Sequence, residues 1–147
     1  MNRVTVVGLG YVGLTLAVAF ARKGLSVFGC DREPGVVTAL QNRRPHLYEP
    51  GVEEGLRERL GRGLHVATEL PCEPVDAAVL CVSTPVHPET REPRLENLRA
   101  AAKSVAEACS SDTLVVVRST VPVGATRRVV LPELLARWGR ARLAFCP

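Results

Sequence analysis

The chain has 147 residues, a size typical of one compact domain. Its composition, 46% hydrophobic and 23% charged, is ordinary for a soluble globular protein and argues against a long disordered segment. The net charge of +4 comes from scattered basic residues, and aromatic residues make up only 4% of the chain, which disfavours nucleic acid as a partner. The positive charge suits a small ligand that carries phosphate.

The longest apolar run, residues 12–21, is far too short to span a membrane and is followed by Arg22 and Lys23. A glycine-rich turn precedes this run and no small-residue cleavage site follows it, so a signal peptide is also disfavoured. We therefore expect no membrane partner and a cytoplasmic location.

The cysteines lack both CxxC spacing and a Cys/His ligand pattern. There are five of them: Cys30, Cys72, Cys81, Cys109 and Cys146. Most fall within apolar runs, so we interpret them as reduced, buried, small hydrophobic residues. No metal is expected.

The first half of the chain alternates short apolar runs with helical patterns. The runs predict strands over residues 3–7, 25–30 and 64–67. The patterns predict helices that begin at Tyr11, Pro34 and Pro50. Gly24 lies where the glycine that follows a helix is expected, which places the end of the first helix at Lys23.

The second half repeats this alternation. Apolar runs predict strands over residues 77–82, 114–117 and 143–145. Helices are predicted over 95–109 and 126–138, with Pro132 breaking or kinking the second. Strands that alternate with helices pair in parallel through right-handed crossovers. We therefore predict a single α/β domain, residues 1–147, with a doubly wound Rossmann sheet of about six strands in the order 3-2-1-4-5-6 and helices on both faces.

A glycine pattern of the GxGxxG type joins the first predicted strand to the first predicted helix. Gly8 permits a tight turn, Gly10 lets the backbone approach a pyrophosphate, and Gly13 lets the helix pack closely on the sheet. A pyrophosphate there would meet backbone N–H groups and the positive end of the helix. The alternative is a glycine-rich turn without a ligand, but the flanking strand and helix favour a dinucleotide.

An acidic residue, Asp31, closes the second predicted strand. Its carboxylate is placed to accept hydrogen bonds from the adenosine ribose, and its charge would repel the 2′-phosphate of NADP. Arg32 favours NADP instead, because a guanidinium beside the acid accommodates a phosphate. An arginine after a strand is, however, often simply solvated. We predict NAD as the cofactor and include both residues among its contacts.

Four segments resemble those of one enzyme family. They are GLGYVGL (residues 8–14), YEPG (48–51), VSTPV (82–86) and STVPVGAT (119–126). In this order and spacing the whole chain resembles the UDP-glucose/GDP-mannose dehydrogenase family, and STVPVG is most similar to the UDP-glucose dehydrogenase branch.

This resemblance implies NAD-dependent oxidation of a nucleotide sugar, in which the C6 hydroxyl becomes an aldehyde and then a carboxylate while two NAD are reduced. It also implies a cysteine, in a later domain, that holds the aldehyde covalently. We therefore expect the chain to be the NAD-binding domain without the central and C-terminal sugar-binding domains, and to be inactive alone. The expected full-length enzyme is a homodimer that uses UDP-glucose, or alternatively UDP-N-acetylmannosamine or GDP-mannose.

The resemblance also implies roles for individual residues. The residues expected along the cofactor phosphates are Gly8, Gly10, Tyr11, Val12 and Gly13. The residues expected to border the cofactor after the fourth strand are Ser83, Thr84 and Pro85, although the same residues are typical of a strand-ending turn. Thr120 is expected beside the nicotinamide and is the one catalytic candidate, with helix capping as its alternative role.

A regulatory module that senses NAD is the alternative function from another class, because it would share the glycine turn. The segments at 48–51 and 119–126 have no evident purpose in such a module, so the enzyme is preferred. Other dehydrogenase families that share the opening motif differ in the segment after the fifth strand.

Overall fold

The protein forms a six-stranded parallel sheet with the strand order β3-β2-β1-β4-β5-β6, seen in a computed structural model that describes residues 2–71 and 73–147. The strands are β1 (Arg3–Val7), β2 (Ser26–Cys30), β3 (Leu64–Ala67), β4 (Ala77–Leu80), β5 (Leu114–Val117) and β6 (Arg142–Phe145). Val4 of β1 lies opposite Val27 of β2 on one side and Ala77 of β4 on the other. This order confirms the predicted doubly wound topology.

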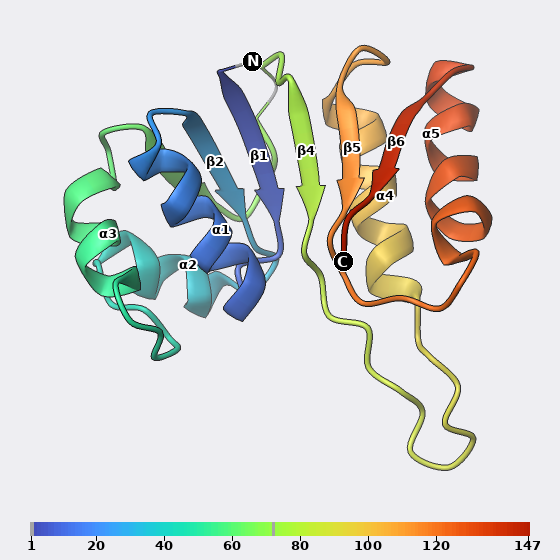
Figure 1. Cartoon of the computed structure of the whole chain (residues 1–147), viewed down its shortest axis with the longest axis horizontal. Coiled ribbons are helices and arrows are strands. Elements are labelled where there is room, and N and C mark those ends of the chain that lie inside the picture. Colours follow the sequence, from blue (N-terminus) through green and yellow to red (C-terminus); the bar gives the residue numbers. More distant parts are fainter. Residues whose placement is uncertain (1, 72) are drawn as a thin grey trace.

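Helices cover the sheet on both faces (Figure 1). One face carries α1 (Tyr11–Arg22), α2 (Pro34–Gln41) and α3 (Val52–Arg59). The other carries α4 (Glu96–Ala108), a five-residue π-helix η1 (Thr126–Val130) and α5 (Leu131–Trp138). The chain changes face after β3, so β1 and β4 are neighbours whose following loops run in opposite directions, which leaves a crevice at their carboxyl ends.

Two hydrophobic cores form, one on each face of the sheet. The core beneath α1–α3 joins β-strand side chains such as Val6 to Leu14 of α1 and Leu56 of α3. The core beneath α4 and α5 joins Leu80 of β4 to Leu98 of α4. Because side chains alternate along a strand, β4 contributes Ala77 and Val79 to the first core and Ala78 and Leu80 to the second, which explains its continuous apolar run in the sequence.

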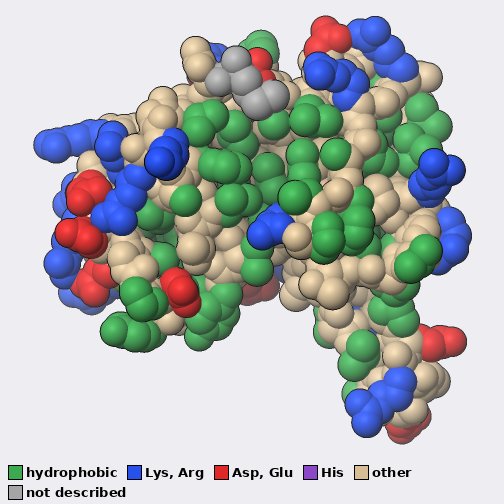
Figure 2. All heavy atoms as spheres, in the orientation of Figure 1, with side chains coloured by type: hydrophobic (Ala, Val, Ile, Leu, Met, Phe, Trp, Pro, Cys, Tyr) green, Lys and Arg blue, Asp and Glu red, His purple; other side chains and the backbone are tan. Residues whose placement is uncertain are grey.

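Part of the sheet has no helix over it on the face that carries α1. Figure 2 shows hydrophobic side chains gathered there, over β4–β6. Leu114 and Val116 of β5 are only partly buried and pack against the edge of the α1 core. Within the described part of the chain, no helix has the length and apolar character needed to cross a membrane.

Two helices depart from their predictions by more than a one-residue shift of an end. The sequence predicts a helix from Pro50, whereas α3 begins at Val52, because Gly51 adopts a left-handed conformation with φ 82°. The helix predicted over 126–138 is divided between η1 and α5. The backbone keeps helical dihedral angles at Val130 and Leu131, so the chain is not broken at the predicted proline. The hydrogen-bond pattern instead changes from π-helical to α-helical just before Pro132, which lies in the first turn of α5.

The interpretation of every cysteine as buried is wrong for Cys146, which is exposed because the chain leaves edge strand β6 just before it. Cys30 is buried, and Cys81 and Cys109 are partly buried. Burial raises the pKa of each of these three thiols to about 11. Cys72 lies outside the described residues.

Candidate cofactor-binding site

The glycine turn after β1 is closed by contacts that only glycine allows at two of its three positions. Gly8 has φ 90°, and a Cβ there would lie 2.8 Å from the carbonyl oxygen of Cys81. A Cβ on Gly13 would lie 1.8 Å from the carbonyl oxygen of Gly8, so Gly13 lets α1 pack onto the turn. At Gly10, by contrast, no atom lies within 4 Å of the Cβ position. The turn is therefore tightly packed at Gly8 and Gly13 and open at Gly10.

Helix α1 begins at this opening without a capping side chain. Its N-cap residue is Gly10, which has no side chain to accept a hydrogen bond, and its first turn contains no acidic residue. Tyr11 and Val12, the first two helical residues, are exposed beside the crevice. Backbone N–H groups at such an end bind anions well.

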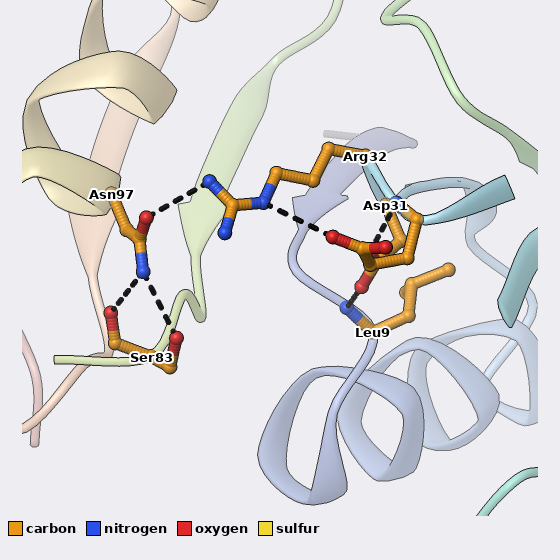
Figure 3. A network of polar contacts seen from close by, with 6 residues as sticks. Leu9, Asp31, Arg32, Ser83 and Asn97 are labelled. Atoms are coloured by element: carbon orange, nitrogen blue, oxygen red, sulfur yellow. Dashed lines mark hydrogen bonds and ion pairs between the residues drawn. The ribbon is translucent and has the colours of Figure 1, made fainter. Parts of the chain in front are cut away.

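Asp31 lies at the crevice, directly after β2, and faces the glycine turn (Figure 3). Its Oδ2 accepts a hydrogen bond of 2.7 Å from the backbone N–H of Leu9, and its Oδ1 accepts one of 3.0 Å from the N–H of Glu33. The carboxylate is thus held at the carboxyl end of β2, beside the glycine turn. This is the position that the strand-ending acid was predicted to occupy.

A cavity of about 900 Å³ follows the carboxyl edge of the sheet. Of the residues predicted to contact the cofactor, those on its wall are Gly8, Gly10, Tyr11, Val12, Asp31, Arg32, Ser83, Thr84 and Thr120. Gly13 lies beneath the turn instead, and Pro85 is not on the wall either. The structure therefore brings most of the predicted residues together around one space.

The loops after β4 and β5 are joined on one side of this cavity. The Thr84 hydroxyl donates a hydrogen bond of 2.7 Å to the carbonyl oxygen of Thr120. The Ser119 hydroxyl donates one of 2.7 Å to the carbonyl oxygen of Val82. These bonds join the two loops to each other.

Asn97 and Arg118 are among the wall residues that the sequence did not predict. Asn97, in the first turn of α4, contacts both Ser83 and Arg32, which come from two other segments. Arg118, directly after β5, donates a hydrogen bond of 3.0 Å to the carbonyl oxygen of Cys146. Neither residue belongs to a local motif, and both act through contacts between segments far apart in the sequence, so sequence patterns offered no signal for them.

The rest of the cavity wall includes the segment after β3, residues 68–70, and small side chains of α4. The α4 residues are Ala100, Ala101, Ser104 and Ala108. Together with the open space at Gly10 and the fixed carboxylate of Asp31, this long, partly apolar groove fits a dinucleotide. Within residues 2–71 and 73–147, no group of three or more His, Cys, Asp or Glu side chains is arranged to hold a metal ion.

Comparison with known proteins finds one family. Residues 2–145 match the model of the UDP-glucose/GDP-mannose dehydrogenase family, NAD binding domain. UDP-N-acetyl-D-mannosamine dehydrogenase from Campylobacter jejuni is 35% identical over 93% of this chain and 32% of its own length. NDP-N-acetyl-D-galactosaminuronic acid dehydrogenase from Ralstonia solanacearum is 34% identical over 98% of this chain and 36% of its own length. The chain spans about a third of the length of these curated relatives.

Solved structures share the fold over almost the whole chain. UDP-N-acetyl-mannosamine dehydrogenase from Staphylococcus aureus superposes with a TM-score of 0.89 at 28% identity, over 99% of this chain and 36% of that one. A UDP-glucose dehydrogenase from Pyrobaculum islandicum superposes with a TM-score of 0.86 at 36% identity, over 99% of this chain and 35% of that one.

Proposed function

Because this chain belongs to the UDP-glucose/GDP-mannose dehydrogenase family, as its NAD-binding domain, we propose that it holds NAD for the oxidation of a nucleotide sugar. The observation that carries this proposal is the carboxylate of Asp31, bonded to the N–H of Leu9 at the mouth of the glycine turn. A fixed acid at this place selects a dinucleotide with free ribose hydroxyls. The residues of the chain, 1–147, act as one cofactor-binding domain, and the sugar-binding part belongs to other domains.

In this proposal different parts of the cavity wall bind different parts of the cofactor. The backbone at Gly10 and the first N–H groups of α1 bind the pyrophosphate, and Asp31 accepts from the adenosine ribose. Ser83, Thr84 and Thr120 border the nicotinamide end. NAD, when bound, supplies the hydride acceptor. Thr120, which lines the cavity, then positions the reacting groups through its hydroxyl.

The sugar is proposed from the relatives. Campylobacter jejuni and Staphylococcus aureus relatives are named for UDP-N-acetylmannosamine, and the Pyrobaculum islandicum relative is named for UDP-glucose. We propose UDP-N-acetyl-D-mannosamine as the first sugar to test and UDP-glucose, which the strand-five motif favours, as the second. A homodimer is proposed for the full-length enzyme.

Calorimetric titration of the chain with NAD tests the cofactor proposal. Asp31→Ala should weaken NAD binding about tenfold or more, because a charged acceptor is lost at the ribose. Asp112→Ala is the matched control. Asp112 lies before β5, at the amino end of that strand and so away from the cavity, and its substitution should leave the affinity unchanged. Equal affinity for the wild type and Asp31→Ala would contradict the assignment of this acid.

A chimera tests the reaction. Residues 2–145, the matched range, would replace the corresponding domain of the Campylobacter jejuni dehydrogenase. With UDP-N-acetyl-D-mannosamine and NAD, the chimera should form two NADH per sugar. A chimera that binds NAD but forms no NADH would favour a regulatory NAD-sensing module instead.

A further inference from the structure

A polar bridge crosses the cavity between the ends of β2 and β4 (Figure 3). Arg32 extends from the end of β2, and its Nη1 donates a hydrogen bond of 2.9 Å to Oδ1 of Asn97 on α4. The Nδ2 of Asn97 donates to the carbonyl oxygen of Ser83 at 3.2 Å and to its hydroxyl oxygen at 3.1 Å. Arg32, Asn97 and Ser83 all line the cavity. The bridge therefore spans the crevice that the cofactor would occupy.

The bridge directs the charge of Arg32 away from Asp31. The carboxylate of Asp31 bonds to backbone N–H groups of Leu9 and Glu33, and no ion pair between Asp31 and Arg32 is present among the described residues. The charged partner of Arg32 is Glu33, whose Oε1 lies 3.6 Å from Nε. Asn97 and Glu33 thus hold the guanidinium through two of its three nitrogens, Nη1 and Nε, which keeps it at the Asn97 side of the cavity.

This geometry bears on the choice between the two pyridine dinucleotides, which differ by one phosphate on the adenosine ribose. An arginine directly after the acid is the side chain most able to bind that phosphate, in a two-pronged, charge-assisted contact. The side chain of Arg32 is 72% exposed, so it is free to move if its partners release it. Arg118, the other arginine of the wall, lies after β5, at the far end from Asp31.

We propose that Asn97 is a specificity-determining residue, which keeps Arg32 from binding a 2′-phosphate and so strengthens the preference for NAD over NADP. This inference rests on the proposed cofactor function of the same cavity. Asp31 repels the phosphate directly, whereas Asn97 acts through Arg32. Asn97 also supports Ser83, but that contact affects both dinucleotides alike, so the ratio of the two dissociation constants isolates the effect on Arg32.

The test is calorimetric titration of the chain and its variants with NAD and with NADP. In Asn97→Ala, the ratio of the NADP to the NAD dissociation constant should fall about 2- to 10-fold, the range that corresponds to the net contribution of one hydrogen bond. In Arg32→Ala the ratio should rise, because the cation is removed. Alanine is also a good helix former, and circular dichroism would verify that α4 remains folded.

The double variant Arg32→Ala/Asn97→Ala makes the test decisive. If Asn97 acts through Arg32, adding Asn97→Ala to Arg32→Ala should leave the ratio unchanged. Asn42→Ala is the matched control, since the Asn42 amide donates to the carbonyl oxygen of Thr38 at the end of α2, away from the cavity, and the ratio should equal that of the wild type. An unchanged ratio in Asn97→Ala, or the same fall with and without Arg32, would overturn the inference. Failure of the wild type to bind NAD would instead overturn the proposed function.

Discussion

At the scale of single residues, the surroundings of a side chain separate cofactor contact from packing. Gly10 and Gly13 belong to the same sequence motif, yet one faces open space and the other faces the backbone of Gly8. The sequence predicts a role for each, and the structure shows which atoms each glycine would meet if it were larger. A substitution at Gly10 should therefore weaken NAD binding, whereas one at Gly13 should lower stability.

Gly10→Ala should fold with nearly wild-type stability but bind NAD more weakly, because its new methyl group takes up space where the phosphates approach the turn. Gly13→Ala should lower the free energy of unfolding by about 3 kcal/mol, because its methyl group would overlap a backbone oxygen that cannot move aside. Urea denaturation measures the free energy of unfolding of each variant, and NAD titration measures its affinity. A stable Gly13→Ala variant would show that α1 can shift, which would contradict the packing role.

The three thiols with a raised pKa should react slowly. Cys30, Cys81 and Cys109 have pKa values of about 11 through burial, so at about pH 8 they remain protonated, whereas exposed Cys146 is open to reagent. Maleimide labelling followed by peptide mass spectrometry should find Cys146 modified before these three. In the unfolded chain these thiols would have their ordinary pKa of about 9 and would ionise more easily than in the folded protein. The free energy of unfolding should therefore be unaffected by them below about pH 9 and should fall as the pH rises from there towards 11.

Labelling of Cys30 as fast as that of Cys146 near neutral pH would contradict this account. Cys30 and Cys81 also line the cavity. Bound NAD should therefore slow their labelling and leave that of Cys109 unaffected.

At the scale of elements, hydrophobic periodicity located the strands well because each central strand is buried on both faces. The run ending at Val117 is apolar throughout, the run before Gly8 is apolar from Val4 to Val7 except for Thr5, and both match their strands. Ends that depend on backbone conformation were harder to predict: Gly51 gives no side-chain signal that it adopts φ 82°. Asn97 was missed because its importance arises only when α4 folds beside the end of β2.

Close packing between helices explains a second glycine. A Cβ on Gly55 of α3 would lie 2.2 Å from Cγ1 of Val18 on α1, so Gly55→Ala should destabilise the protein by about 1–3 kcal/mol. Gly35 of α2 has no atom within 4 Å of its Cβ position, so Gly35→Ala should stabilise it by about 0.5–1 kcal/mol. Urea denaturation of the two variants measures both effects. Equal effects would mean that α1 and α3 do not pack as closely as described.

At the scale of the whole molecule, the two cores lie on opposite faces of the sheet, and the cavity lies at the carboxyl ends of the strands that separate them. Its walls come from β1, α1 and the end of β2 on one side, and from the ends of β4 and β5 with α4 on the other. A ligand in this position contacts both halves and stabilises both against unfolding.

NAD should raise the thermal unfolding midpoint in a concentration-dependent way. At a free concentration of about 100 times the dissociation constant, ligand binding adds about 2.7 kcal/mol to the stability. Differential scanning calorimetry measures the shift, and Gly10→Ala at the same NAD concentration is the control, with a smaller shift expected. Equal shifts in the two proteins would contradict binding at the glycine turn.

The placement of the cavity on the boundary between the cores has a consequence for motion. Local opening of either half separates the walls, so an occupied crevice resists the opening of both. Deuterium uptake by backbone amides should therefore slow together in β2 and in α4, two segments that share no loop and no core, once the dinucleotide bridges them.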